Sequence, residues 1–561
     1  MRLPALCVLF LALAASAGAQ TPLAGDAAPT RADTLRGTVT PERAWWDVTH
    51  YDLAVRVDPA AQAIRGTVGI TFRTLQPART LQIDLQEPLV LDAATLGASA
   101  GGAALPVRRD GNALFVTLPE APAAGAMRTV TLAYHGTPRE AVNAPWDGGF
   151  VWTADSLGRP VVATAVQGLG ASAWWPVKDT QTDEPDSQRV AITVPDGLTN
   201  VSNGRLRETR RNGDGTTTFV WAVVNPINTY DVAVNAAHYA HFSDTYDGES
   251  GPLTLDFYPL DYNADRARRQ FAQVRPMLAC FEHWFGPFPW YEDGYKLVET
   301  PHLGMEHQSA VAYGNGYRNG YRGRDRSGSG TGDSWDFIIV HESGHEWWGN
   351  SLTAADIADM WLHESFTNYS EYLFVECEQG PEAGSRYAVG SRRNIQNDAP
   401  IVGPFGVSRE GSSDMYDKGG NMLHTIRQVV GDDARWRATL RGLQARYRHQ
   451  TVTGSEVRRA MSDLTGVDLS AIFEQYLETT RIPALEVRLD PVAGGGSTLF
   501  YRWADVVPGF AMPVDVTLAD GAFSRVTPTS DWQAAASTLT SLAAFRVDED
   551  FYVTVRAVAA P

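Results

Sequence analysis

The spacing of hydrophobic residues along the chain changes twice. From Tyr51 to about residue 245, apolar and polar residues alternate over short runs such as YDLAVRVD, IRGTVGITFRT and RVAITVPDG, which are separated by Gly, Pro and Asp. Alternation with period two, broken by turn residues, is typical of antiparallel β-structure. This pattern predicts an N-terminal β saddle or sandwich over residues 44–247.

From about residue 263 the apolar spacing becomes that of helices. The segment RARRQFAQVRPMLACFEHWFG predicts an amphipathic helix ended by Gly286 and Pro287. DSWDFIIVHESGHEWWGN predicts a second helix, with Asp333 or Ser334 as its N-cap. Further helices are expected in HESFTNYSEYLFVECEQG, GGNMLHTIRQVVGDD and GSEVRRAMSDLTG.

After Pro483 the alternation returns, in runs such as ALEVRLD, TLFYRWADV and FYVTVRAV. These runs predict a small C-terminal β-sandwich over residues 483–561. A chain of 561 residues also exceeds what one hydrophobic core usually organises. The predicted fold class is therefore multidomain α+β, with a mixed α/β region over residues 248–482 between two β domains.

The N-terminus has the composition of a secretory signal. Arg2 precedes an apolar run from Leu3 to Ala15 and a small-residue site at 17–19, which predicts a cleavable signal peptide over residues 1–19. Residues 20–43 lack apolar periodicity and are expected to form a linker or tail. We therefore expect a secreted or periplasmic protein, and the alanine-rich signal suggests a bacterial source.

Composition and charge narrow the classes of partner. Hydrophobic residues make up 44% of the chain and charged residues 20%, which is typical of globular proteins. The formal net charge of −18 argues against a nucleic-acid-binding protein, whose footprint is a basic patch. After the signal, no apolar stretch approaches the length of a transmembrane segment.

Removal of the signal peptide would leave two cysteines, Cys280 and Cys377. In an oxidising compartment they could form one disulfide. Both lie in apolar, helix-like surroundings, MLACFEHWF and YLFVECEQG, which favour two unpaired buried thiols.

The segment HESGHEWWGN carries the strongest chemical signal. His341 and His345 are four residues apart on a predicted helix, so both imidazoles can reach one cation, with Glu342 at the same level of the helix. Glu364 begins the next predicted helix and can supply a carboxylate as third ligand. Two histidines and one carboxylate leave the fourth position of a zinc ion open, the arrangement of catalytic sites.

Four segments resemble motifs of one peptidase family. HESGHEWWGN followed by WLHESFTNY is similar to a zinc helix with its second ligand helix, and LGMEHQSA to a Gly-Met-Glu exopeptidase motif. MYDKGGNMLH is similar to a Tyr-x-Lys-Gly element, and VQGLGASAWWP to a segment with a glutamine nine residues before a proline. Over residues 45 to 480 the chain thus resembles aminopeptidase N and leukotriene hydrolase, the gluzincin zinc metallopeptidases of peptidase family M1.

The resemblance implies a thermolysin-like catalytic domain over residues 248–482 and one Zn²⁺ per chain. It implies that the metal ligands are His341, His345 and Glu364. Glu342 is expected to act as the general base and to pass its proton to the leaving amine. Tyr416 is expected to donate its phenol hydrogen to the tetrahedral oxyanion, although it could instead be a packing aromatic.

For substrate binding, the resemblance points to the exopeptidase motif and the β domain. Glu306, with Gly304 and Met305, is expected to bind the free α-ammonium of a peptide substrate. Gln167 would accept a second hydrogen bond from the same amine; Gln181 and Gln188 lie nearby in the sequence.

The chain departs from the family pattern at two positions. His307 and His363 stand where the family commonly has Asn. His363 is adjacent to Glu364, and neighbouring helix residues face directions about 100° apart, so we expect His363 to support the site rather than bind the metal. The chain ends after the small sandwich, without the large helical terminal domain of some members, and we therefore expect a more open cleft.

The sequence thus predicts an exported zinc aminopeptidase that acts on peptides with a free N-terminal amine. Two alternatives remain. One is a zinc endopeptidase or a hydrolase of another amide. The other is a non-catalytic secreted binding protein whose β domains serve recognition.

Overall fold

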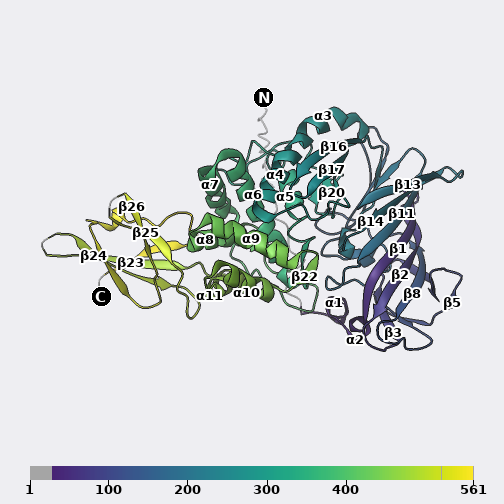
Figure 1. The fold of residues 1–561 in the computed structure, drawn as a ribbon, viewed down its shortest axis with the longest axis horizontal. Coiled ribbons are helices and arrows are strands. Elements are labelled where there is room, and N and C mark those ends of the chain that lie inside the picture. The colour runs from purple at the N-terminus through teal and green to yellow at the C-terminus, as the bar shows by residue number, and fades with distance from the viewer. Residues whose placement is uncertain (1–27, 494, 520, 560–561) are drawn as a thin grey trace, which may run out of the picture.

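The computed structural model describes residues 28–493, 495–519 and 521–559. The predicted signal peptide lies outside these ranges. Within them, no helix is both long and apolar enough to cross a membrane. A β-rich N-terminal region, a helical central region and a C-terminal β region follow one another along the chain (Figure 1).

The N-terminal region is built on an eight-stranded sheet in the order β13-β14-β11-β1-β2-β8-β4-β5. Its strands are β1 (Trp46–Asp58), β2 (Ala63–Thr74), β4 (Val90–Leu96), β5 (Ala103–Ala104), β8 (Met127–Gly136), β11 (Ser187–Pro195), β13 (Arg205–Arg211) and β14 (Thr216–Val223). Neighbours are antiparallel, as the alternation predicts, except that β1 and β11 are parallel. More than a hundred residues separate these two strands, so a hairpin does not set their direction.

Two smaller sheets complete this region. They have the orders β12-β15-β10-β9 and β3-β7-β6. Their strands are β3 (Thr80–Asp84), β6 (Val107–Asp110), β7 (Ala113–Thr117), β9 (Gly149–Ala154), β10 (Pro160–Ala165), β12 (Thr199–Val201) and β15 (Asn235–Ala237). The sheets share one hydrophobic core that includes the buried indoles of Trp45, Trp174 and Trp175. The turn after β10 carries Gln167 toward the central region.

The central region combines a five-stranded sheet with helices. The sheet order is β16-β17-β18-β20-β19. Its strands are β16 (Phe242–Gly248), β17 (Gly251–Tyr258), β18 (Tyr295–Glu299), β19 (Gly304–Met305) and β20 (Val311–Tyr313). The helices are α3 (Ala264–Gln270), α4 (Val274–Phe285), α5 (Phe337–Gly344), α6 (Trp361–Gln379), α7 (Pro381–Ser391), α8 (Asp417–Val430), α9 (Asp433–Tyr447), α10 (Gly454–Thr465) and α11 (Ser470–Glu478).

Two of the predicted helices differ in detail from the structure. The first is interrupted at residues 271–273 by a 3-10 turn before α4 continues and ends at Gly286. Pro276 has no amide hydrogen and therefore cannot donate to the backbone carbonyl one turn before it, as an unbroken helix requires. This accounts for the break. In the second, the N-cap is Asp336 rather than Asp333 or Ser334, and its side chain accepts from the Ile338 amide.

The C-terminal β region extends beyond α8 and α11, away from the N-terminal sheets (Figure 1). It contains a four-stranded sheet in the order β27-β24-β23-β28 and a two-stranded sheet. The strands are β23 (Ala484–Pro491), β24 (Ser497–Ala504), β25 (Val514–Ala519), β26 (Ala522–Val526), β27 (Gln533–Ser537) and β28 (Thr554–Ala557). The core of the central region continues into it through Leu485 and Trp503.

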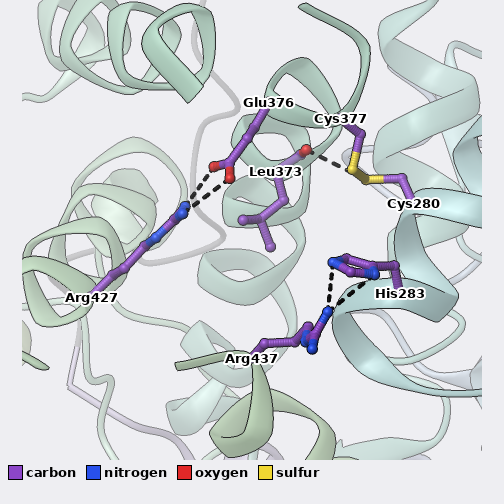
Figure 2. Close-up of a disulfide and its surroundings, with 7 residues drawn as sticks. All are labelled: Cys280, His283, Leu373, Glu376, Cys377, Arg427 and Arg437. Atoms are coloured by element: carbon purple, nitrogen blue, oxygen red, sulfur yellow. Dashed lines mark hydrogen bonds and ion pairs between the residues drawn. A yellow bond between two sulfur atoms is a disulfide. The ribbon is translucent and has the colours of Figure 1, made fainter. Parts of the chain in front are cut away.

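A disulfide joins Cys280 of α4 to Cys377 of α6, and Figure 2 shows the two sulfur atoms bonded. The Cα atoms are 6.0 Å apart, a separation that a disulfide spans. The preference for two unpaired thiols is therefore wrong. Cys280 is buried, as expected, but Cys377 is exposed, so the expected burial of both thiols is also wrong. The side-by-side packing of the two helices decides the pairing.

The N-terminal segment forms a strap across two domains. It contains α1 (Arg31–Gly37) and α2 (Pro41–Ala44), where the sequence pattern predicts only a linker. The partly buried Arg36 guanidinium donates to the Gly168 carbonyl at 2.6 Å. Thr38 donates to the carbonyl of Gly406 at 2.9 Å. The strap thus connects the turn after β10 with a loop of the central region.

Candidate active site

Helices α5 and α6 bring the three predicted metal ligands together. His345 follows the last residue of α5 but keeps helical dihedral angles, so it lies one turn from His341. Glu364 Oε2 lies 3.6 Å from His341 Nε2 and 3.4 Å from His345 Nε2. Ligands about 2.0–2.2 Å from a tetrahedral zinc ion are separated by about 3.3–3.6 Å. The spacing therefore fits zinc.

The chemistry of the donor atoms also fits zinc. The buried Glu364 Oε2 has no hydrogen-bond partner among the described residues. The other nitrogen of each histidine is engaged: His341 Nδ1 lies 2.8 Å from Glu371 Oε1, and His345 Nδ1 lies 2.9 Å from the Trp348 carbonyl. These acceptors place a proton on each Nδ1 and leave both Nε2 lone pairs facing Glu364.

Glu342 lies beside the metal ligands and faces the pocket. Burial raises the pKa of its carboxyl to about 7, against the opposing effect of His341 and His345. Gly304 explains how Glu342 fits, because a Cβ atom at that position would collide with the Glu342 carboxylate. The Gly-Met-Glu motif therefore makes room for the residue expected to act as base.

Glu306 is buried at the end of β19, with 3% of its surface exposed. Its Oε1 accepts from Gln167 Nε2 at 2.5 Å and from the Tyr230 hydroxyl at 3.2 Å. Oxygen and nitrogen atoms of Glu306, Glu342 and His345 lie within 4.8 Å of one another. The structure thus brings Gln167 to Glu306 from another domain, whereas Gln181 and Gln188 do not line this pocket.

The pocket encloses about 810 Å³, part of it open to solvent. The residues lining it are Pro145, Trp146, Gln167, Gly168, Leu303, Gly304, Met305, Glu306, His341, Glu342, His345, Glu364, Glu410, Ser413, Met415 and Tyr416. Every predicted site residue is in this set. Tyr416 precedes α8, and burial holds the pKa of its phenol well above 10, so the hydroxyl remains a hydrogen-bond donor.

Three residues near the pocket were missed in the sequence. Glu371, which orients His341, lies seven residues after Glu364 on α6, and this two-turn spacing was a usable signal. Tyr230 lies in a short 3-10 turn over Thr229–Asp231 and Glu410 in a loop, and such short segments give no periodicity in the sequence.

The two departures from the family pattern lie behind the site. His363 Nε2 accepts from the Ala354 amide at 2.9 Å, which supports the backbone next to the zinc helix, as expected of a residue that does not bind the metal. His307 is fully buried, and neither ring nitrogen has a partner among the described residues. Burial lowers the pKa of both imidazoles to about 3, so both are neutral.

Comparison with known proteins identifies related chains. Aminopeptidase N of Lactococcus lactis subsp. lactis is 28% identical over 226 residues, covering 36% of this chain and 26% of the relative. Aminopeptidase B of Homo sapiens is 24% identical over 446 residues, covering 72% of this chain and 64% of the relative. The chain therefore spans less than two thirds of these relatives. A solved M1 zinc metallopeptidase from Deinococcus radiodurans has a TM-score of 0.64 at 21% identity, covering 78% of this chain and 95% of that chain.

The β-rich N-terminal region, the HExxH helix and the glutamate of the following helix together define the gluzincin class of zinc metallopeptidase. Two family descriptions match the chain: "Peptidase M1 N-terminal domain" over residues 48–230 and "Peptidase family M1 domain" over residues 304–476. Together they span more than half of its length. The chain belongs to peptidase family M1.

Proposed function

We propose that this protein is an exported zinc aminopeptidase that hydrolyses the first peptide bond of peptides with a free N-terminal amine. One observation carries the proposal. The buried Glu306 carboxylate lies in the same pocket as the metal ligands, within 4.8 Å of Glu342 and His345. An anionic group that close to the metal fits an α-ammonium one residue from the scissile carbonyl. In an endopeptidase, a carboxylate at this position would have no α-ammonium to bind.

The residues divide the reaction among them. When bound by His341, His345 and Glu364, zinc would polarise the scissile carbonyl and make water a better nucleophile at neutral pH. Glu342 takes the proton from the attacking water and delivers it to the leaving amine.

Binding and charge stabilisation use the other pocket residues. Glu306 accepts hydrogen bonds from the α-ammonium, and the Gln167 amide oxygen accepts another. Gly304 and Met305 line the pocket beside them. The Tyr416 hydroxyl donates to the oxyanion that develops on the carbonyl oxygen.

The test uses aminoacyl chromogenic amides and short peptides, each with a free or an acetylated N-terminus, on protein of measured zinc content. We expect cleavage of the free substrates only, because acetylation leaves the buried Glu306 carboxylate unpaired. A chelator should abolish activity, and Glu342→Gln should retain zinc while losing turnover. Equal rates on free and acetylated peptides would favour an endopeptidase. Full activity without metal would exclude the mechanism altogether.

Export is the second part of the proposal. The signal-like residues 1–19 support it, and so does the Cys280–Cys377 disulfide, because disulfides persist in oxidising compartments. Expression of the full chain in a bacterial host should yield periplasmic or secreted protein that begins near residue 20, measured by intact mass. Uncleaved protein confined to the cytoplasm would contradict export.

A further inference from the structure

Glu410 is a pocket carboxylate that the reaction proposed above does not use. It lines the pocket together with Glu306, Glu342 and Glu364. Within the described part of the chain, neither a hydrogen bond nor an ion pair reaches its side chain. Burial, together with the carboxylates of Glu364 and Glu306, raises the pKa of Glu410 to about 7, and no cationic group among the described residues opposes this rise. A cationic group of a bound ligand would supply a countercharge to this carboxylate.

Among the carboxylates of the pocket, Glu410 is the one to which the proposed reaction assigns neither a proton nor a cation. As far as residues 28–493, 495–519 and 521–559 show, the pocket lining contains four glutamates and neither lysine nor arginine. In the proposed reaction, Glu364 faces zinc, Glu342 takes a proton and Glu306 faces the α-ammonium. Glu410 is partly buried, and a carboxylate that has lost part of its hydration and has no partner is less stable as an anion. A second positive charge on the substrate would stabilise it.

The loop that carries Glu410 is held firmly in place. The Ser412 amide donates to the Pro400 carbonyl at 2.9 Å, and Gly411 packs so closely on Ile401 that a Cβ would collide with its carbonyl. Gly406 accepts from Thr38 of the strap, and its own amide donates to Asp356 at 2.8 Å. The position of Glu410 is therefore set by the fold.

The position of Glu410 indicates which part of a substrate it faces. Glu410 lines the same pocket as Glu364, at the metal, and Glu306, at the ammonium, and both carboxylates raise its pKa. In a bound peptide, the first α-carbon lies between the ammonium and the scissile carbonyl, so the first side chain leaves the backbone near both. Trp146 and Leu303 also line the pocket and offer apolar surface to the methylene groups of a long side chain.

We propose that Glu410 is a specificity-determining residue that selects substrates whose first residue has a cationic side chain, lysine or arginine. The inference rests on the proposed aminopeptidase function and names its substrate class.

The test compares each cationic residue with a neutral residue of similar shape. Zinc-loaded wild-type protein is assayed on fluorogenic amides of arginine and citrulline, and of lysine and norleucine. We expect kcat/KM to favour the cationic member of each pair roughly 10- to 100-fold, the range for a hydrogen bond to a charged group. In Glu410→Gln the ratio should fall to near one. Glu474→Gln, the same change at an exposed position on α11, should keep the wild-type ratio.

Calorimetry gives a readout that is independent of turnover. L-Arginine and L-citrulline are titrated into zinc-loaded protein, and Glu410→Gln should weaken the binding of arginine by a similar factor, with a smaller effect on citrulline. Zinc content and melting temperature report whether the variant folds. If wild-type protein cleaves no aminoacyl amide, the proposed function fails, while calorimetry still tests the pairing of Glu410 with a cation.

Three results would overturn the proposal. The first is a wild-type ratio near one in both assays. The second is a preference for the cationic member that survives in Glu410→Gln. The third is an effect of Glu410→Gln that is confined to the second residue of the substrate, detected by comparing Ala-Arg with Ala-citrulline. Glu410 would then recognise the charge of the residue that follows the scissile bond.

Discussion

At the scale of single residues, the Tyr416 hydroxyl is expected to act only in the transition state. Tyr416→Phe keeps the ring, which stacks on His341 with centroids 6.1 Å apart, so folding and zinc content should not change. Loss of one oxyanion donor lowers kcat by on the order of 10² to 10³, and KM should change little because the bond is absent in the ground state. Steady-state kinetics measures both. A kcat within a few fold of wild type would make Tyr416 a packing residue.

A second prediction at this scale concerns Glu371, which accepts from His341 Nδ1 at 2.8 Å and from the Tyr387 hydroxyl at 3.0 Å. Glu371→Gln keeps the shape but removes the charge that makes the imidazole a stronger ligand. We expect zinc affinity to fall about 10- to 100-fold, measured by competition with a chromogenic chelator.

The matched control for Glu371 is Glu376→Gln. Glu376 lies on the same helix but forms an ion pair with Arg427, away from the metal ligands. Equal zinc affinities of the two variants would remove Glu371 from the metal site.

At the scale of elements, the disulfide between α4 and α6 fixes the helix that carries Glu364. It closes a loop with a sequence separation of 97. Closure of a loop that long stabilises a protein by about 2–4 kcal/mol. The double variant Cys280→Ser/Cys377→Ser should therefore melt roughly 5 to 10 °C lower in calorimetry.

A chemical control distinguishes the disulfide from the effect of the serines. Reductant should lower the melting temperature of wild-type protein and leave that of the double variant where it is. Titration of denatured wild-type mature protein should find no free thiol. Two free thiols per chain would show that the bond does not form.

At the scale of the whole molecule, the strap makes the active site depend on contacts between domains. Arg36 holds the Gly168 carbonyl, next to Gln167, and its Nε lies 3.9 Å from Asp179. Arg36→Met should loosen the turn and weaken binding of the substrate amine in ground and transition states alike. We expect KM to rise about 5- to 10-fold, with a much smaller change in kcat.

Arg31→Met is the control for the strap. Arg31 is also on α1, but its side chain is exposed and pairs with Asp110. If both variants have wild-type KM values, the strap does not support the site.

The sequence by itself determined the parts of this protein that depend on local periodicity. The four-residue spacing of His341 and His345 places both on one helical face whatever surrounds the helix, and the structure confirms their convergence with Glu364. The β-rich N-terminal region, the helical centre and the C-terminal β region follow from the change in hydrophobic period in the same way.

Tertiary structure alone decided which distant residues meet. The Cys280–Cys377 bond, the support of the Gln167 turn by Arg36 and the unpaired position of Glu410 all depend on how elements pack. Periodicity identifies the buried face of an element but does not specify the element that covers it. Loop residues such as Glu410 have no periodicity at all, so their positions follow only from the packing of the complete fold.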